Sequence, residues 1–142
     1  MTVSYDLAPA VQRLLGDHHP TGISTGFLKS IRGDWPQLVE EAESFSMFAA
    51  ELSALSQAEL EPLVRYIDGQ SALPFQYLSV HGPSKGLEGD EEALVDALAL
   101  LVPFVDSIVM HPDTIRDPHE YRRLGRTLVI ENMDRRKAWG RS

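Results

Sequence analysis

Ile108-Val109-Met110-His111 is one of four short apolar runs in this sequence that end on a residue able to hold a metal ion or a proton. The other three are Phe48-Ala49-Ala50-Glu51, Leu78-Ser79-Val80-His81 and Leu128-Val129-Ile130-Glu131. Amphipathic helical stretches separate the runs, and this alternation is typical of parallel β/α units. In a parallel barrel the carboxyl ends of the strands meet at one rim. We therefore expect two imidazoles and two carboxylates to face a common opening.

Four helices, one before the first of these runs and one between each pair of successive runs, are predicted from their capping residues. Asp34, Ser56, Asp90 and Asp117 each stand where a side-chain oxygen can cap a helix start. Ser56 also forms a capping box with Glu59, because the side chain of a glutamate three residues after a capping serine can accept a hydrogen bond from the backbone amide of that serine. The helix after Asp117 has proline at its first position and is expected to end at Gly125. The pattern thus predicts a helix after each strand.

These elements predict an α/β fold in which residues 22–142 form a partial TIM barrel. The strands are expected to end near positions 28, 51, 81, 111 and 131, the first being a strand over Ile23 to Leu28, and residues 1–21 are expected to form an N-terminal helical extension. A closed barrel of eight units needs at least about 200 residues, whereas this chain has 142. We therefore expect a half-barrel of about five units. Either the sequence is a fragment of a longer protein, the favoured interpretation, or copies of the chain pair to cover the open edge.

Composition restricts the classes of function. The chain has 43% apolar and 24% charged residues, as an ordinary globular protein has, and it contains no cysteine, so any metal is held by nitrogen and oxygen. Its formal net charge of -8 disfavours nucleic acid and favours a small polar substrate. Its start lacks the pattern of a secretory signal, and no segment has the length of a membrane span. A cytoplasmic location is expected.

A metal site is predicted at His81, His111 and Glu131. Neighbouring strands lie only about 5 Å apart, so the three strand ends can meet at one point. Two imidazoles and a carboxylate suit Zn, Mn or Fe(II). Each imidazole then needs an acceptor for its second N–H, for which Asp113 and Glu51 are candidates. The alternative is a ring of polar residues that bond to loop amides.

The two glutamates are candidates for catalysis. Glu131 follows an apolar strand and is expected to be partly desolvated, which raises the pKa of a carboxyl unless a cation compensates. Glu51 can act as an acid/base group or as a partner of a metal ligand. A solvated position at the rim is the alternative for Glu51.

The strand ends resemble those of the xylose isomerase-like superfamily of TIM barrels, which includes sugar isomerases, 3-epimerases and endonuclease IV. The resemblance covers roughly residues 22–134 and is carried by four motifs: Ala50-Glu51-Leu52-Ser53, Ser79-Val80-His81-Gly82-Pro83, Val109-Met110-His111-Pro112 and Val129-Ile130-Glu131-Asn132. The endonuclease IV branch implies zinc ligation by His81, His111 and Glu131. The isomerase and epimerase branch implies that Glu131 binds a divalent ion and takes part in proton transfer.

These observations predict the N-terminal portion of a metal-dependent sugar isomerase or epimerase-like protein. Its catalytic residues are expected to be Glu131 and Glu51, its metal Zn or Mn, and its reaction the abstraction of a proton next to a carbonyl. One alternative is a zinc phosphodiesterase acting on DNA, as in endonuclease IV. Another is a non-catalytic interaction domain that keeps only the first half of a barrel.

Overall fold

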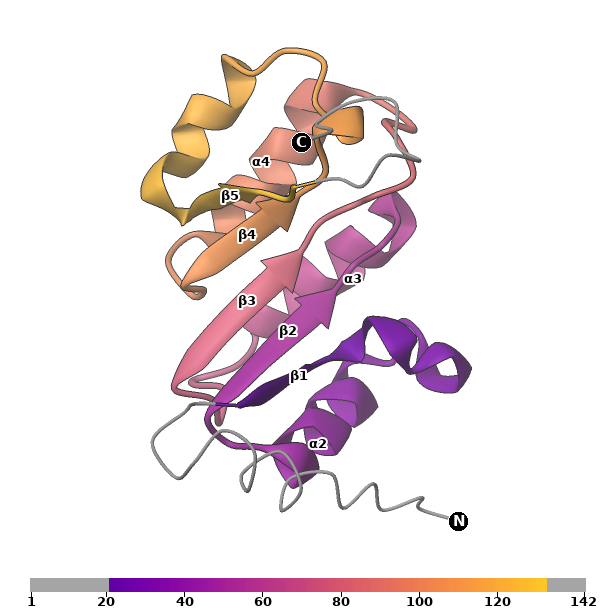
Figure 1. Ribbon diagram of the computed structural model, residues 1–142, viewed down its shortest axis with the longest axis vertical. Helices are drawn as coiled ribbons and strands as arrows, with labels where there is room; N and C mark the ends of the chain where they lie inside the picture. Colours follow the sequence, from indigo (N-terminus) through magenta and orange to yellow (C-terminus); the bar gives the residue numbers. More distant parts are fainter. Residues whose placement is uncertain (1–20, 133–142) are drawn as a thin grey trace.

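The computed structural model describes residues 21–132, which form an open α/β fold around one five-stranded sheet (Figure 1). The strands lie in the order of the sequence, and each pairs in parallel with the next. They are β1 (Gly22–Ser24), β2 (Ala49–Ser53), β3 (Tyr77–His81), β4 (Ser107–Met110) and β5 (Leu128–Ile130). The sheet does not close on itself. Consecutive parallel strands joined by helices confirm the predicted β/α repeats.

The three α-helices of the described residues begin where the sequence predicts. They are α2 (Trp35–Phe45), α3 (Gln57–Asp68) and α4 (Glu91–Leu101). The side chain of Asp34 accepts a hydrogen bond from the Gln37 amide, and Asp90 caps α4 in the same way. The capping box of α3 is also present, because Glu59 accepts a bond of 2.8 Å from the Ser56 amide.

The first strand ends four residues before the predicted position 28. After Ser24 the chain turns into two short 3-10 helices, η1 (Thr25–Phe27) and η2 (Lys29–Ile31). Thr25 is buried, and its hydroxyl accepts a hydrogen bond of 3.0 Å from the Ser53 amide. This bond takes up the Ser53 amide at the end of β2. The predicted strand is therefore confirmed at Ile23 and Ser24, whereas its continuation to Leu28 was wrong.

The fourth predicted helix is not α-helical. The segment forms a 3-10 helix, η4 (Glu120–Thr127), after the short η3 (Pro112–Thr114). Gly125 lies inside η4 with a φ of 56°, a left-handed conformation that glycine adopts without strain. The backbone of Gly125 is not helical, so the first helical turns of η4 end at this residue, as the sequence predicts.

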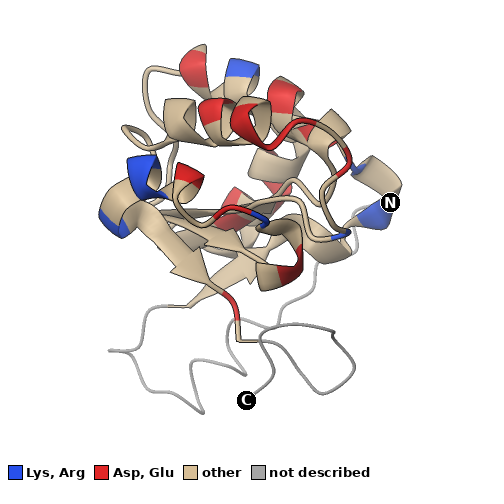
Figure 2. Ribbon diagram, turned by 90° about the horizontal axis from the view of Figure 1, so that it is seen from above, with Lys and Arg blue, Asp and Glu red and all other residues tan. Residues whose placement is uncertain are grey.

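The described helices pack on only one of the two faces of the sheet. Alternate strand residues, including Leu52, Val80 and Ile108, are fully buried against the helices. Figures 1 and 2 show α2, α3 and α4 on this one face. The intervening residues, such as Glu51, Ser79 and His81, point to the opposite face, since side chains alternate along a strand. No described helix packs on that second face, although parallel sheets are ordinarily covered on both.

Both edge strands are three residues long, and β5 leaves apolar side chains exposed. Val129 is 44% and Ile130 is 48% exposed. A cleft of about 780 Å³ lies against this edge, and apolar side chains of Ile115, Tyr121 and Leu128 contribute to its lining. Within residues 21–132, β5 is therefore an edge strand of the sheet.

Some predictions lie outside the described residues. These include the helical extension up to residue 20 and the part of the partial barrel beyond residue 132. Within the described range, none of the helices combines the length and the apolar character needed to cross a bilayer.

Candidate metal centre

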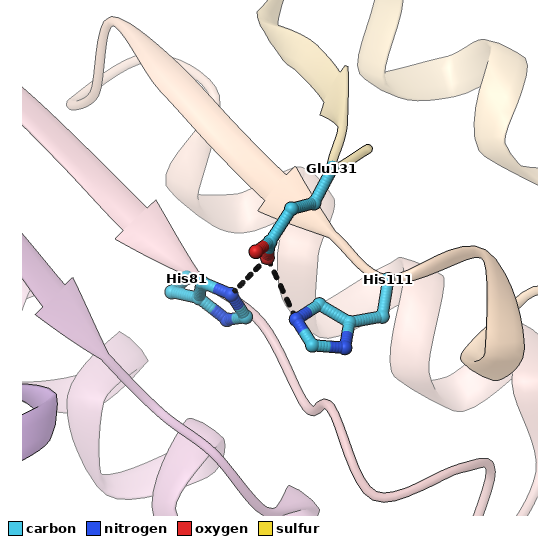
Figure 3. A group of neighbouring side chains, drawn as sticks. All are labelled: His81, His111 and Glu131. Carbon is cyan, nitrogen blue, oxygen red and sulfur yellow. Dashed lines mark hydrogen bonds and ion pairs between the residues drawn. The ribbon is translucent and has the colours of Figure 1, made fainter. Parts of the chain in front are cut away.

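Three consecutive strands bring His81, His111 and Glu131 to the same corner of the sheet face opposite α2, α3 and α4 (Figure 3). His81 is the last residue of β3, and His111 directly follows β4. Glu131 follows β5, and its amide donates a hydrogen bond of 2.9 Å to the Met110 carbonyl, so strand pairing extends to this residue. The parallel register therefore places all three side chains at the carboxyl edge of the sheet, as the sequence predicts.

The carboxylate of Glu131 lies between the two imidazole rings. Its Oε2 is 3.0 Å from His81 Nε2 and 2.7 Å from His111 Nε2. The ring centroids are 4.9 Å apart, and the rings meet nearly edge to face. One ligand atom from each residue can be chosen so that all three lie within 4.8 Å of one another. This group is compact enough to surround a single small ion.

The hydrogen bond made by His81 Nδ1 determines the role that is left for His81 Nε2. Its Nδ1 lies 2.8 Å from the Gly82 carbonyl oxygen, which can only accept, so Nδ1 carries a proton. In a neutral ring, Nε2 then presents its lone pair to Glu131 Oε2, which is also an acceptor. Two acceptors at 3.0 Å require a proton or a cation between them. His81 is thus oriented to use Nε2 as a ligand atom.

Glu131 does not have the raised pKa expected of a desolvated carboxyl. The hydrogen bond with His81 lowers the pKa of Glu131 below its ordinary value, burial opposes this, and the nearby His111 lowers it further. The side chain is also 43% exposed, so desolvation is incomplete. Glu131 is therefore an ionised carboxylate at neutral pH, the form that binds metal.

The donor set fits a divalent ion. Zinc bonds to imidazole nitrogen at about 2.0 Å, so two ligands of a tetrahedral site lie about 3.3 Å apart. The present separations of 2.7 and 3.0 Å from Glu131 to the imidazoles are slightly shorter than this, and the ligand atoms of the two histidines lie within 4.8 Å of each other. Both histidine side chains are only 12% exposed, which limits their competing contact with water. These three residues could therefore hold a metal ion.

Glu51 lies on the same face but outside this cluster. It stands in register with Ser24 and Ser79, and its Oε1 accepts a hydrogen bond of 2.8 Å from the Ser24 hydroxyl. Ser53, the strand partner of His81, is a further hydroxyl neighbour at 3.5 Å. Glu51 is therefore paired with hydroxyl groups, and its predicted role in catalysis stays a prediction.

The acceptor for the second N–H of His81 differs from the predicted ones. Asp113 and Glu51 were the expected acceptors, but the Gly82 carbonyl occupies this position. Sequence reasoning missed it because every residue carries a backbone carbonyl, so the sequence shows no signal. It also missed Thr114, whose hydroxyl donates a bond of 2.8 Å to the Pro83 carbonyl.

The acidic residues lie mainly on the helical layer, away from the candidate metal centre. Figure 2 shows them concentrated on the helices, and within the five strands Glu51 is the single charged residue. The net charge of -8 is therefore not a measure of the charge around His81 and His111.

No protein-family model matches this chain, and neither a curated protein nor a solved structure shows significant similarity to it. The argument for function therefore rests on the geometry of the described residues.

Proposed function

We propose that the chain is the N-terminal portion of a metal-dependent, sugar isomerase or epimerase-like TIM-barrel protein. One observation carries this proposal: His81, His111 and Glu131 converge at the carboxyl edge of a parallel sheet. Active sites of TIM barrels lie at this edge of the strands. The open five-stranded sheet with helices on one face supports a barrel of which these are the first units.

In this proposal His81, His111 and Glu131 hold a divalent ion that supplies Lewis acidity to a carbonyl oxygen of the substrate. Glu131 has a lowered pKa, which suits a ligand better than a general base. Glu51 is the available carboxylate on the same face, one strand away from His81. In this proposal Glu51 takes the proton from the carbon next to the carbonyl and delivers it to the former carbonyl carbon, which completes an isomerisation. An epimerisation would need a second acid on the opposite face of the substrate.

The proposal predicts metal-dependent exchange of a substrate proton. The chain loaded with Zn²⁺ or Mn²⁺ is incubated in D₂O with a panel of ketoses and aldoses, and deuterium next to the carbonyl is followed by NMR. Glu51→Gln should slow the exchange by about 100-fold or more, while leaving metal affinity unchanged. Absence of exchange from the metal-loaded parent chain would contradict the isomerase proposal.

A second candidate is a zinc phosphodiesterase acting on DNA, in which the ion activates a water molecule. The participation of both histidines favours it, because a set of two histidines and a glutamate with an open position is typical of hydrolytic zinc sites. The location of acidic residues on the helical layer also weakens the electrostatic objection to a phosphate backbone. Cleavage of an abasic DNA duplex, lost on addition of chelator, would select this candidate.

A non-catalytic interaction domain is the third candidate, and a second copy of the chain is its proposed partner. The half-exposed Val129 and Ile130 at the edge of the sheet favour such a contact. Light scattering should then show a dimer, and chelator should leave thermal stability unchanged. A monomer whose stability depends on metal would contradict this candidate.

A cytoplasmic location also stays a prediction.

A further inference from the structure

The loops that follow the two histidines are joined by a buried hydrogen bond. Thr114 has no exposed surface, and its hydroxyl donates a bond of 2.8 Å to the Pro83 carbonyl in the loop after β3. The Thr114 amide donates a bond of 3.1 Å to the His111 carbonyl. Thr114 thus connects the backbone of His111 to the loop that follows His81.

The peptide after His81 is held from both sides. The His81 carbonyl accepts a bond of 2.9 Å from the Ala54 amide, and the Gly82 amide donates a bond of 2.9 Å to the Val109 carbonyl. A Cβ on Gly82 would lie 2.3 Å from the sulfur of Met110, which is fully buried. Glycine therefore permits this close approach to β4, and the His81–Gly82 peptide, which precedes the Gly82 carbonyl, is held by bonds to both neighbouring strands.

We propose that Thr114 and Gly82 are positioning residues of the candidate metal centre. The Gly82 carbonyl keeps the Nδ1 of His81 protonated, so that Nε2 faces the site. Thr114 keeps the loops after His81 and His111 at the separation that allows the Nε2 atoms of both histidines to contact the Glu131 carboxylate. Groups that orient metal ligands in this way typically contribute 10- to 100-fold to metal affinity. This inference rests on the proposed metal site and adds the residues that preorganise it.

A purely structural role for Thr114 makes a different prediction. If its hydroxyl only satisfies a buried carbonyl, its removal lowers the stability of the fold but leaves the affinity of the folded protein for metal unchanged. The two roles are therefore separated by measuring metal affinity and metal-free stability on the same variants.

The experiment compares Thr114→Val with Thr114→Ser by calorimetric titration with Zn²⁺. Valine has the shape of threonine without the hydroxyl, whereas serine keeps the hydroxyl. We expect Thr114→Val to weaken zinc binding by about 10-fold and Thr114→Ser to restore most of the loss. Ser46→Ala is the matched control, because Ser46 donates an equivalent bond of 2.8 Å to the Thr21 carbonyl before the start of β2, at the opposite end of the strands.

Each outcome supports or overturns the inference. Equal zinc affinities of Thr114→Val and Thr114→Ser, or an equal loss in Ser46→Ala, would overturn it and leave the proposed metal site intact. Failure of the parent chain to bind zinc would overturn the proposed site together with this inference. Nitrogen NMR of the metal-free parent gives an independent measurement: His81 Nδ1 should appear as a protonated nitrogen, and a neutral ring protonated only on Nε2 would overturn the role of Gly82.

Discussion

Glu59 at the start of α3 and Glu131 after β5 are two carboxylates whose pKa values both lie below the ordinary value, but for different reasons. Burial raises the pKa of Glu59, and hydrogen bonds from Arg32 and Ser56 lower it by more. Glu131 is lowered mainly by its contacts with His81 and His111. Arginine is always charged and cannot bind a metal ion, whereas imidazole can exchange its proton for one. The identity of the partner, more than the direction of the pKa shift, therefore distinguishes a structural pair from a candidate site.

The largest contrast between the two regions should be in metal binding. His111→Ala removes one of three ligand groups and is expected to weaken Zn²⁺ binding by more than about 100-fold, since even the loss of an outer partner costs 10- to 100-fold. Glu59→Gln should leave zinc affinity unchanged, as should His119→Ala, which removes an exposed histidine outside the cluster. Calorimetric titration measures all three. A similar loss in His119→Ala would mean that zinc binds at the surface.

The second contrast is in folding stability without metal. Glu59→Gln removes the charge that pairs with Arg32 and weakens the capping box, at a side chain that is only 13% exposed. We expect a loss of about 1 to 2 kcal/mol in the free energy of unfolding. Glu131→Gln should lose less, because its carboxylate is more exposed. Chemical denaturation in the presence of chelator gives both values, and a larger loss for Glu131→Gln would reverse the comparison.

The stabilisation by Glu59 should depend on pH in a defined direction. Its pKa is lower in the folded than in the unfolded chain, so the folded state favours the ionised form. The stability difference between the parent and Glu59→Gln should be constant above the pKa of an unfolded glutamate, about 4.3. It should disappear as the pH falls through the lower folded value. Unfolding curves of both proteins over an acidic pH series measure this, and a difference that grows on acidification would contradict it.

The smallest effect is expected at Glu51, whose side-chain partners within residues 21–132 are the Ser24 and Ser53 hydroxyls, with neither an arginine nor an imidazole. Glutamine keeps the oxygen that accepts the bond from Ser24, so Glu51→Gln should change the free energy of unfolding by no more than about 0.5 kcal/mol. Thermal and chemical unfolding test this value. A large loss would show that the group of Glu51, Ser24 and Ser53 supports the fold and would weaken its proposed role in proton transfer.

The part of the fold that was predictable depends on local patterns. The strands ending near Glu51, His81 and His111 and the caps at Asp34 and Asp90 are encoded by neighbouring residues, and the structure confirms these elements. The early end of β1 was not predictable, because it depends on a bond between Thr25 and Ser53. The 3-10 form of η4 was missed because its first residues carry the same capping signals as an α-helix.

The proximity of His81, His111 and Glu131 was predictable because consecutive parallel strands place their ends at one edge. The lowered pKa of Glu131 was not, since the sequence does not show how closely the imidazoles approach the carboxylate. The supports at Gly82 and Thr114 were missed because both act through backbone carbonyls of the neighbouring loop. The chemical roles of the three residues stay predictions.

The three-residue length of β1 and β5 has a consequence for self-association. Each border of the sheet offers few free amides and carbonyls, so it is a poor template for the addition of further strands in an amyloid-like manner. Any assembly of this chain should therefore remain small, and fibre growth at high protein concentration should be slow.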